Sequence, residues 1–323
     1  MRLADVLPDA QVRAIDRAGH LTFHCVGDTG GIHDPAPQES VAEVMIAELE
    51  GCDPARFFYH LGDVVYLYGE EANYGPQFFQ PYAAYTAPIV AIPGNHDGDV
   101  APGSAAAPLQ AFIAHFCAPT PRPPRNRVDV QRLAMAQPNV YWTLLHDWIT
   151  IVGLYTNVAD GGQIAGEQLR WLTSELSAAP TGVTLILALH HPVYSVDSVH
   201  GSNLALGELL DRSFEEAGRA PDAVFSAHVH NYQRFNRTLH GRQIPYVVAG
   251  SGGFHALHSV APGIARLPAS FTGLPDVTLD THQDTAFGFM TVRASPGQTE
   301  VTYSTVSEGI ASVFDSFAIA AAD

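Results

Sequence analysis

Five short apolar runs along the chain are each followed at once by a polar cluster of aspartate, asparagine or histidine. The runs cover residues 21–26, 57–61, 89–92, 185–189 and 223–227. Continuous apolar runs of this length are typical of strands that are buried on both faces of a sheet. Helical patterns lie between several of them, at 39–50, 78–85, 166–178 and 203–217, although Pro81 weakens the second. This alternation of strands and helices predicts an α/β fold.

A second group of strand patterns follows a different arrangement. Residues 140–145 and 148–154 are joined by His146 and Asp147, which predicts an antiparallel hairpin. Further strands are predicted at 245–249, 286–294, 299–305 and 313–319. No linker divides the 323 residues, so we expect one domain, 1–323, that mixes parallel and antiparallel strands. The irregular segment 98–127 contains six prolines and predicts a long insertion loop, a kind of segment that is usually functional or mobile.

Composition excludes several classes of protein. With 46% hydrophobic and 15% charged residues, the chain is neither disordered, collagen-like nor a coiled coil. Its sixteen basic residues are all arginines and face 33 acidic ones, for a net charge of −17. Such acidity argues against a nucleic-acid-binding surface, which needs positive charge.

Cysteine usage and the apolar stretches bear on the compartment. Cys25, Cys52 and Cys117 form no C-x-x-C pair, which argues against a disulfide framework and fits a reducing compartment. The first twenty residues lack the apolar core of a signal peptide, and no apolar stretch is long enough to span a bilayer. We therefore expect a cytoplasmic protein that does not bind membranes, although a trimmed periplasmic or secreted protein would look the same. The oligomeric state is not indicated.

The polar clusters together predict a metal site. They read GDTG at 27–30, GDVVY at 62–66, GNHD at 94–97, HHP at 190–192 and HVH at 228–230. Ligands of open α/β sheets bind beyond the carboxyl ends of the strands, where these clusters would meet. His228 and His230 are two apart on an extended segment, so their rings point to the same face. Carboxylate oxygens and imidazole nitrogens suit zinc, iron or manganese. Each cluster alone has an ordinary structural explanation, but the five in this order do not.

The same five motifs, in this order, resemble the calcineurin-like metallophosphoesterase superfamily. Most members have Asp-x-His as the first motif, whereas here Gly30 replaces that histidine and Tyr66 stands three residues after the second aspartate. This pair of changes resembles the purple acid phosphatase branch. The resemblance extends from Leu21 over most of the chain. It implies a four-layer αββα sandwich with two facing mixed β-sheets and a dinuclear metal site at one edge.

The resemblance also implies a set of ligands. The first metal would be held by Asp28, Asp63, Tyr66 and His230, and the second by Asp63, Asn95, His190 and His228, with Asp63 bridging. His96 and His200 would contact phosphate or protonate the leaving group. Only one of His190 and His191 can face the metal; the position of Pro192 favours His190, and His191 stays an alternative. In the last motif, Ala227 replaces the family's usual glycine.

The charge of the implied ligands favours a trivalent ion paired with a divalent one, and such a pair suits the hydrolysis of phosphate esters. A tyrosinate ligand favours Fe(III) at the first position, with Fe(II), Zn(II) or Mn(II) at the second. Such a pair keeps a net positive charge, which can attract a small phosphate ester despite the acidic chain. We expect direct attack by a metal-bound hydroxide, without a covalent enzyme intermediate, and a phosphomonoesterase as the function. A phosphodiesterase, acting for example on cyclic nucleotides, would use the same core. A non-catalytic interaction protein is disfavoured because all seven candidate ligands are present.

Two further features of the sequence are less specific. Four arginines, Arg122, Arg125, Arg127 and Arg132, gather in a segment that is either a solvated loop or a substrate-steering lid. His24 and His60 lie inside predicted strands, where we expect them to be hydrogen-bonded core residues or to support the metal site from behind.

Overall fold

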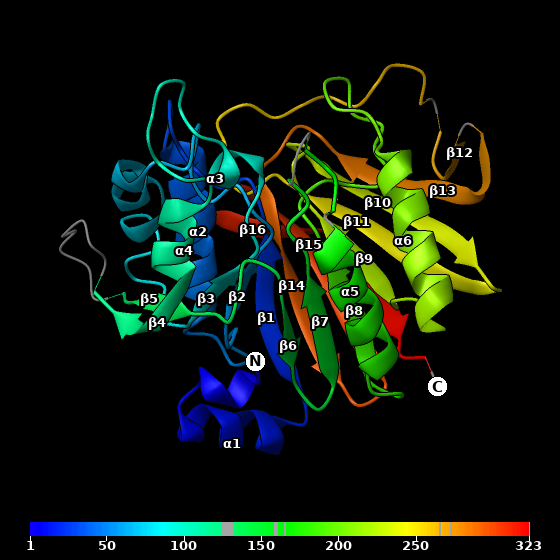
Figure 1. Ribbon diagram of the computed structural model, residues 1–323, viewed down its shortest axis with the longest axis horizontal. Helices are drawn as coiled ribbons and strands as arrows, with labels where there is room; N and C mark the ends of the chain where they lie inside the picture. The colour runs from blue at the N-terminus through cyan, green and yellow to red at the C-terminus, as the bar shows by residue number, and fades with distance from the viewer. Residues whose placement is uncertain (124–131, 158–160, 165, 265, 272, 323) are drawn as a thin grey trace.

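Two β-sheets face one another in the computed structural model, which describes residues 1–323 except 124–131, 158–160, 165, 265, 272 and 323 (Figure 1). The six-stranded sheet has the order β16 (Ile310–Ala320), β15 (Gln298–Ser307), β14 (Gly288–Ser295), β1 (Leu21–Val26), β2 (Phe58–His60) and β3 (Ile89–Ala91). Strands β1, β2 and β3 are parallel, and β14, β15 and β16 are antiparallel to their neighbours. The predicted mixture of strand directions is therefore confirmed in this sheet.

The second sheet has eight strands. Their order is β12 (Ala269–Phe271), β13 (Leu274–Gln283), β10 (Tyr232–Leu239), β11 (Arg242–Ala249), β9 (Ala223–Ser226), β8 (Thr184–Ala188), β7 (Ile149–Gly153) and β6 (Trp142–Leu145). The central strands β11, β9, β8 and β7 are parallel, whereas β6 and β7 form the predicted antiparallel hairpin. A small separate sheet pairs β4 (Cys117–Arg122) with β5 (Ala134–Ala136).

The helices α2 (Ala36–Glu48) and α4 (Gln110–Phe116) cover the outer face of one large sheet, and α5 (Gly166–Ala178) and α6 (Leu204–Ala217) cover that of the other (Figure 1). Helix α1 (Asp9–Ala18) lies below the two sheets, where Ile15 joins the core between them. The remaining helical segments are short: α3 (Asn95–Gly98) and turns at Leu3–Asp5, Glu71–Asn73 and Gly75–Phe79. Side chains of α2 and α4 pack on the six-stranded sheet, and those of α5 and α6 pack on the eight-stranded sheet. None of the described helices is long and apolar enough to cross a membrane.

Alternating side chains of the buried strands build three apolar layers. In β2, Tyr59 points into the core between the sheets, while its neighbour Phe58 packs on the helix side. In β8, Ile186 points inward and Leu187 packs under the helices. A fold of four layers, helix, sheet, sheet and helix, results from this burial on both faces, as expected.

Two expectations for the segment between β2 and β5 are wrong. The helix predicted at 78–85 is a π-helical turn at Gly75–Phe79 followed by irregular turns, because Pro81 lacks the N–H that a helix interior needs. The segment 98–127 is not a loop throughout, since it contains α4 and β4. Helix α4 is held by Phe112 and Phe116, whose rings pack against each other and, for Phe116, against Phe78.

The arginine cluster is placed only in part. Arg125 and Arg127 lie outside the described residues. Arg132 is not a solvated side chain, because its guanidinium donates to the backbone oxygens of Ala87 and Tyr82 at 3.1 and 3.3 Å. Its position on the core rather than over the carboxyl ends of the strands gives no support to a steering lid.

Candidate metal centre

Every predicted metal ligand except Tyr66 lies within four residues of the carboxyl end of a parallel strand. Asp28 follows β1, Asp63 follows β2, Asn95 follows β3 and His190 follows β8, while His228 and His230 follow β9. Because the two sheets face each other, these ends meet at one edge of the sandwich. His190 and Asp63 come from different sheets, yet their Nε2 and Oδ2 atoms are 3.3 Å apart.

Three of these residues have a left-handed backbone although none is glycine. The φ angles of Asp28, Asp63 and His228 are 55°, 53° and 66°. Such a conformation costs on the order of 1–3 kcal/mol per residue and is concentrated at functional sites. Hydrogen bonds hold it here. Between the two sheets, the His228 N–H donates to Asp28 Oδ2 at 2.7 Å, and within the six-stranded sheet the Asp28 N–H donates to the backbone oxygen of Gly62 at 3.0 Å.

The first group of donor atoms comprises Asp28, Tyr66 and His230. The buried Tyr66 hydroxyl donates to Asp28 Oδ1 at 3.1 Å, and His230 Nε2 lies 3.4 Å from the same hydroxyl. His230 Nδ1 lies 3.1 Å from the oxygen of Ala256, which can only accept, so Nδ1 carries a proton and the Nε2 lone pair of the neutral ring faces Tyr66. Burial, then the charges of Asp28 and Asp63, raise the pKa of Tyr66 well above its usual value. Only a nearby cation would make this hydroxyl ionise.

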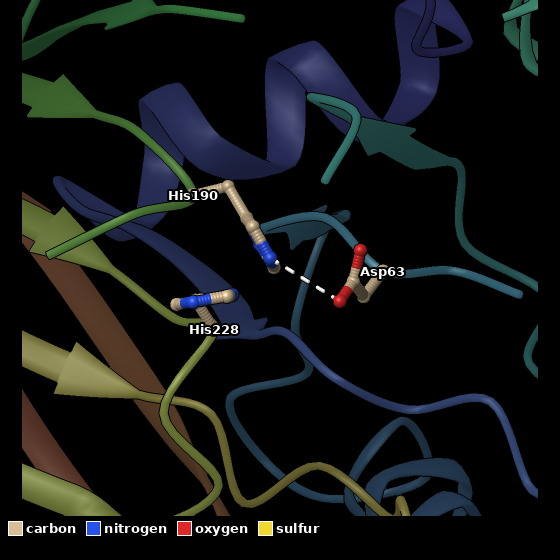
Figure 2. A group of neighbouring side chains, drawn as sticks. All are labelled: Asp63, His190 and His228. Atoms are coloured by element: carbon tan, nitrogen blue, oxygen red, sulfur yellow. Dashed lines mark ion pairs between the residues drawn. The ribbon is translucent and has the colours of Figure 1, made fainter. Parts of the chain in front are cut away.

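The second group comprises Asp63, Asn95, His190 and His228. Figure 2 shows the His190 ring pointing at the Asp63 carboxylate, with His228 beside them. His190 Nε2 lies 3.2 Å from Asn95 Oδ1, and His228 Nδ1 lies 3.0 Å from the same oxygen. The other nitrogen of His190 donates to the oxygen of Leu61 at 2.9 Å. Burial lowers the pKa of His190, but Asp63 outweighs burial and raises it to about 9.

These donor sets fit metal ions. Asp63 Oδ2 is buried, and its ion-pair partner His190 Nε2 lies 3.3 Å away without a well-aligned hydrogen bond, although a poorly satisfied buried acceptor is costly. One ligand atom each from Asp63, His190 and His228 lie within 4.8 Å of one another. A cation among them would satisfy the carboxylate oxygen, the amide oxygen and the imidazole lone pairs together. Oxygen and imidazole ligands of this kind suit iron, zinc or manganese.

The structure separates the two adjacent histidines. His191 turns away, with its ring at 88° to that of His190 and its Nδ1 2.8 Å from Thr156 Oγ1. We expect His190→Ala to lose at least one metal ion per chain. Removing a residue that only hydrogen-bonds to a metal ligand typically lowers activity roughly 10–100-fold, and we expect loss of His190 itself to lower phosphoester hydrolysis by more than that. The matched variant His191→Ala should keep both metals. Metal analysis of the two purified variants checks this, and the reverse pattern would make His191 the ligand.

The presence of Tyr66 explains sterically why position 30 holds a glycine instead of the histidine that most family members have. A Cβ atom on Gly30 would lie 2.6 Å from Gln77 Oε1 and 2.8 Å from Tyr66 Cδ2, so no side chain fits at position 30 while Tyr66 is in place. Gln77 in turn fixes the backbone of Tyr66. Its side-chain amide accepts from the Tyr66 N–H at 2.8 Å and donates to the Tyr66 backbone carbonyl oxygen at 3.0 Å. Ala227 is accommodated in a similar way, since its methyl group packs against Gly27, where a Cβ would be only 2.5 Å away.

His96 and His200 border the two groups. His96 Nδ1 lies 2.8 Å from the oxygen of Leu67, which leaves Nε2 free, and its ring centre is 4.6 Å from that of Tyr66. The ring centre of His200 is 4.4 Å from that of His228, and neither ring nitrogen of His200 has a hydrogen-bond partner among the described residues. Behind the site, His60 Nε2 lies 2.8 Å from Thr29 Oγ1, and His24 contacts Tyr85 and Glu48, so both histidines are hydrogen-bonded core residues as predicted.

Sequence analysis missed the residues that support the ligands through the backbone. Asp97 accepts from the N–H groups of Val64, Val65 and Gly94 at 2.9–3.2 Å and so fixes the turns that carry Asp63 and Asn95. Its place in GNHD was the only signal in the sequence. Asp197 accepts from the N–H groups of Val199 and His200 at 2.9 and 2.6 Å. Nothing in the sequence pointed to Phe254, which packs on the rings of Tyr66 and His230.

Comparison with known proteins places this arrangement in a family. The profile of the calcineurin-like phosphoesterase family matches residues 21–232. Purple acid phosphatase 23 of Arabidopsis thaliana is 26% identical over 187 residues, which cover 55% of this chain and 36% of the relative. Purple acid phosphatase 15 of the same plant is 33% identical over 97 residues, which cover 28% of this chain and 18% of the relative. The alignments therefore span little more than a third of the length of purple acid phosphatase 23 and less than a fifth of the length of purple acid phosphatase 15.

Solved structures share the fold. The purple acid phosphatase PPD1 from yellow lupin (Lupinus luteus) superposes with a TM-score of 0.68 at 19% identity, over 93% of this chain and 54% of that one. GAP50, the anchor in the inner membrane complex of Plasmodium, has a TM-score of 0.67 at 13% identity, over 94% of this chain and 90% of that one. At these identities the likeness supports the fold alone. The family model, which matches more than half of the chain, shows that the chain belongs to the calcineurin-like phosphoesterase family, and the curated relatives that it resembles are purple acid phosphatases.

Proposed function

We propose that the chain hydrolyses phosphate monoesters at a dinuclear metal centre. The observation that carries this proposal is the convergence of buried carboxylate, amide and imidazole ligand atoms, above all Asp63 Oδ2, at the edge where both sheets end. The family of the chain, in which purple acid phosphatases are relatives, supports two ions rather than one.

The proposed ligands fall into two overlapping sets. The first ion would be held by Asp28, Asp63, Tyr66 and His230, and the second by Asp63, Asn95, His190 and His228. Asp63 is the natural bridge, because it faces the second set with Oδ2 and is close enough to Tyr66 to raise the pKa of that phenol. A tyrosinate supports Fe(III) in the first set, with Fe(II), Zn(II) or Mn(II) in the second. When bound, such ions activate a water molecule and neutralise the charge of the phosphoryl oxygens.

The chain's own residues would orient the ester and handle the proton. Hydrolysis breaks the P–O bond to the organic group, the oxygen of water becomes the new phosphate oxygen, and a proton ends on the leaving oxygen. The free Nε2 of His96 and the ring of His200 border the donor atoms, and either histidine would contact the phosphate or deliver that proton. Two histidines that can donate hydrogen bonds to the phosphate, in addition to the metal ions, support a monoester as the substrate, because the phosphate group of a monoester carries one more negative charge than that of a diester.

Metal analysis combined with hydrolysis of matched esters tests the proposal. With two ions per chain, we expect kcat/KM for p-nitrophenyl phosphate to exceed that for bis(p-nitrophenyl) phosphate by at least about tenfold, and a chelator to abolish both activities. A reversed preference would identify a phosphodiesterase. Two bound ions without hydrolysis of either ester would instead indicate a non-catalytic interaction protein and contradict the proposal.

A further inference from the structure

A preformed pocket of about 490 Å³ lies directly beside the second group of donor atoms. The histidines His191, His200 and His228 line it together with two large apolar residues, Val199 and Leu204, which form its apolar wall. The segment that carries these two apolar residues runs from Asp197 into the first turn of α6. A volume of this size is within the usual range for a small-molecule site.

Hydrogen bonds hold the apolar wall in place. Asp197 accepts from the Val199 and His200 N–H groups. Asn203 caps α6 by accepting from the Leu206 N–H at 3.0 Å, and its amide donates to the oxygen of Gly162 at 2.8 Å. The wall is therefore rigid at both ends, although Val199 and Leu204 themselves are 61% and 43% exposed. Large apolar side chains that are exposed together at a pocket mark a binding surface.

The described lining of the pocket carries no permanent positive charge. None of the described residues that line it is an arginine, and the chain contains no lysine. The arginines of the neighbouring strands β10 and β11 are already paired with aspartates: Arg234 with Asp280 and Asp315, Arg237 with Asp211 and Asp276, and Arg242 with Asp222. With a net charge of −17, the protein would repel a second anionic group that entered here. Such a group would also lose hydration without gaining a permanently charged partner among the described lining residues.

We infer that this pocket receives the organic group of the ester and selects esters whose organic group is small, uncharged and apolar. Aryl and branched alkyl phosphates fit this description, whereas nucleoside polyphosphates and carboxylated phosphate esters do not. The inference rests on the proposed function for the position of the phosphate. The metal centre binds the phosphoryl group, and the wall of Val199 and Leu204 covers the group attached to it.

Two matched esters test the charge selection. Phenyl phosphate and 3-carboxyphenyl phosphate release phenols of similar acidity, because a meta carboxylate hardly changes the phenol. We expect kcat/KM for phenyl phosphate to be at least about tenfold higher than for 3-carboxyphenyl phosphate. Tenfold is the lower end of the selectivity between related substrates that contacts in a binding pocket provide. Equal kcat/KM values for the two esters would overturn the inference.

Two double variants test the apolar wall. Val199→Ser combined with Leu204→Ser should raise KM for phenyl phosphate about tenfold and leave kcat and the inhibition constant of inorganic phosphate unchanged. The control combines Leu133→Ser and Val313→Ser, which change side chains of comparable exposure, 45% and 69%, that do not line this pocket. An unchanged KM in the first double variant, or the same rise in the control, would contradict the assigned role.

Binding separates failure of this inference from failure of the proposed function. If the metal-loaded protein hydrolyses no ester, the proposed function fails. Calorimetry with phenylphosphonate and 3-carboxyphenylphosphonate, which cannot be hydrolysed, then still tests the pocket. A preference of about tenfold or more for the uncharged phosphonate sustains the inference, and equal affinities overturn it.

Discussion

Replacing Asp63 by alanine is expected to abolish phosphoester hydrolysis and to remove most of the bound metal from both subsites. Asp63 is the ligand that the two proposed sets share, and its Oδ2 is buried 3.3 Å from His190 Nε2. Loss of a bridging carboxylate takes a negative ligand from each ion at once, so we expect activity to fall by at least roughly 1,000-fold, a loss of several kcal/mol in transition-state stabilisation. Metal content per folded chain and kcat/KM are the two measurements.

Asp222 provides a matched control. Both carboxylates are 1% exposed, but Asp222 lies just before β9, at the opposite end of the strand from His228 and His230. Asp222→Ala should lower the melting temperature, because the carboxylate accepts from the Leu185 N–H and pairs with Arg242. Its metal content should stay normal. Near-normal metal content and turnover in Asp63→Ala would rule out Asp63 as the bridging ligand.

The second large effect is expected for Tyr66→Phe. The proposed bond between the Tyr66 phenolate and Fe(III) would give the protein a visible charge-transfer colour, which should vanish when the ligand oxygen is removed. The volume of the side chain hardly changes, so the packing against Phe254 and His96 should persist. The first subsite should also lose its preference for a trivalent ion, while activity can survive with two divalent ions. Absorption spectra and iron analysis of the loaded variant check both effects.

Tyr59→Phe is the control for this experiment. Tyr59 is as deeply buried as Tyr66, and its hydroxyl has no hydrogen-bond partner among the described residues. Its ring points into the core between the sheets, away from the metal centre. The colour should persist in Tyr59→Phe. A colourless wild-type protein that is fully active with two Zn(II) or Mn(II) ions would contradict the assignment of Tyr66 as an iron ligand.

The sequence predicts the fold and most of the site because apolar runs mark the buried strands, and the polar residues of the site follow directly after these runs. Strands covered on both faces are continuous apolar runs, so the polar cluster after each run stands out. Strands β10 and β13 were not expected, since they alternate apolar residues with polar ones such as Arg234 and Asp280, which bond to each other across the sheet. The helix predicted at 78–85 failed at Pro81, whose effect on the local backbone was underestimated.

Residues that act through the backbone left no pattern that could be recognised. Gln77, Asp97 and Asp197 hold the turns that carry Tyr66, Asp63 and His200, and their partners are N–H and C=O groups that every residue has. The adjacent histidines could not be separated from spacing alone. Their orientations depend on Thr156, which lies 35 residues before His191 in the chain and contacts it only in the folded protein.

Anomalous scattering from crystals of the protein loaded with iron and zinc locates the two proposed ions directly. We expect two peaks: an iron peak in bonding contact with Tyr66 Oη, Asp28 and His230, and a second peak beside Asn95, His190 and His228, with Asp63 in contact with both. A single peak, or an iron peak well outside bonding distance of the Tyr66 oxygen, would contradict the dinuclear assignment of this site.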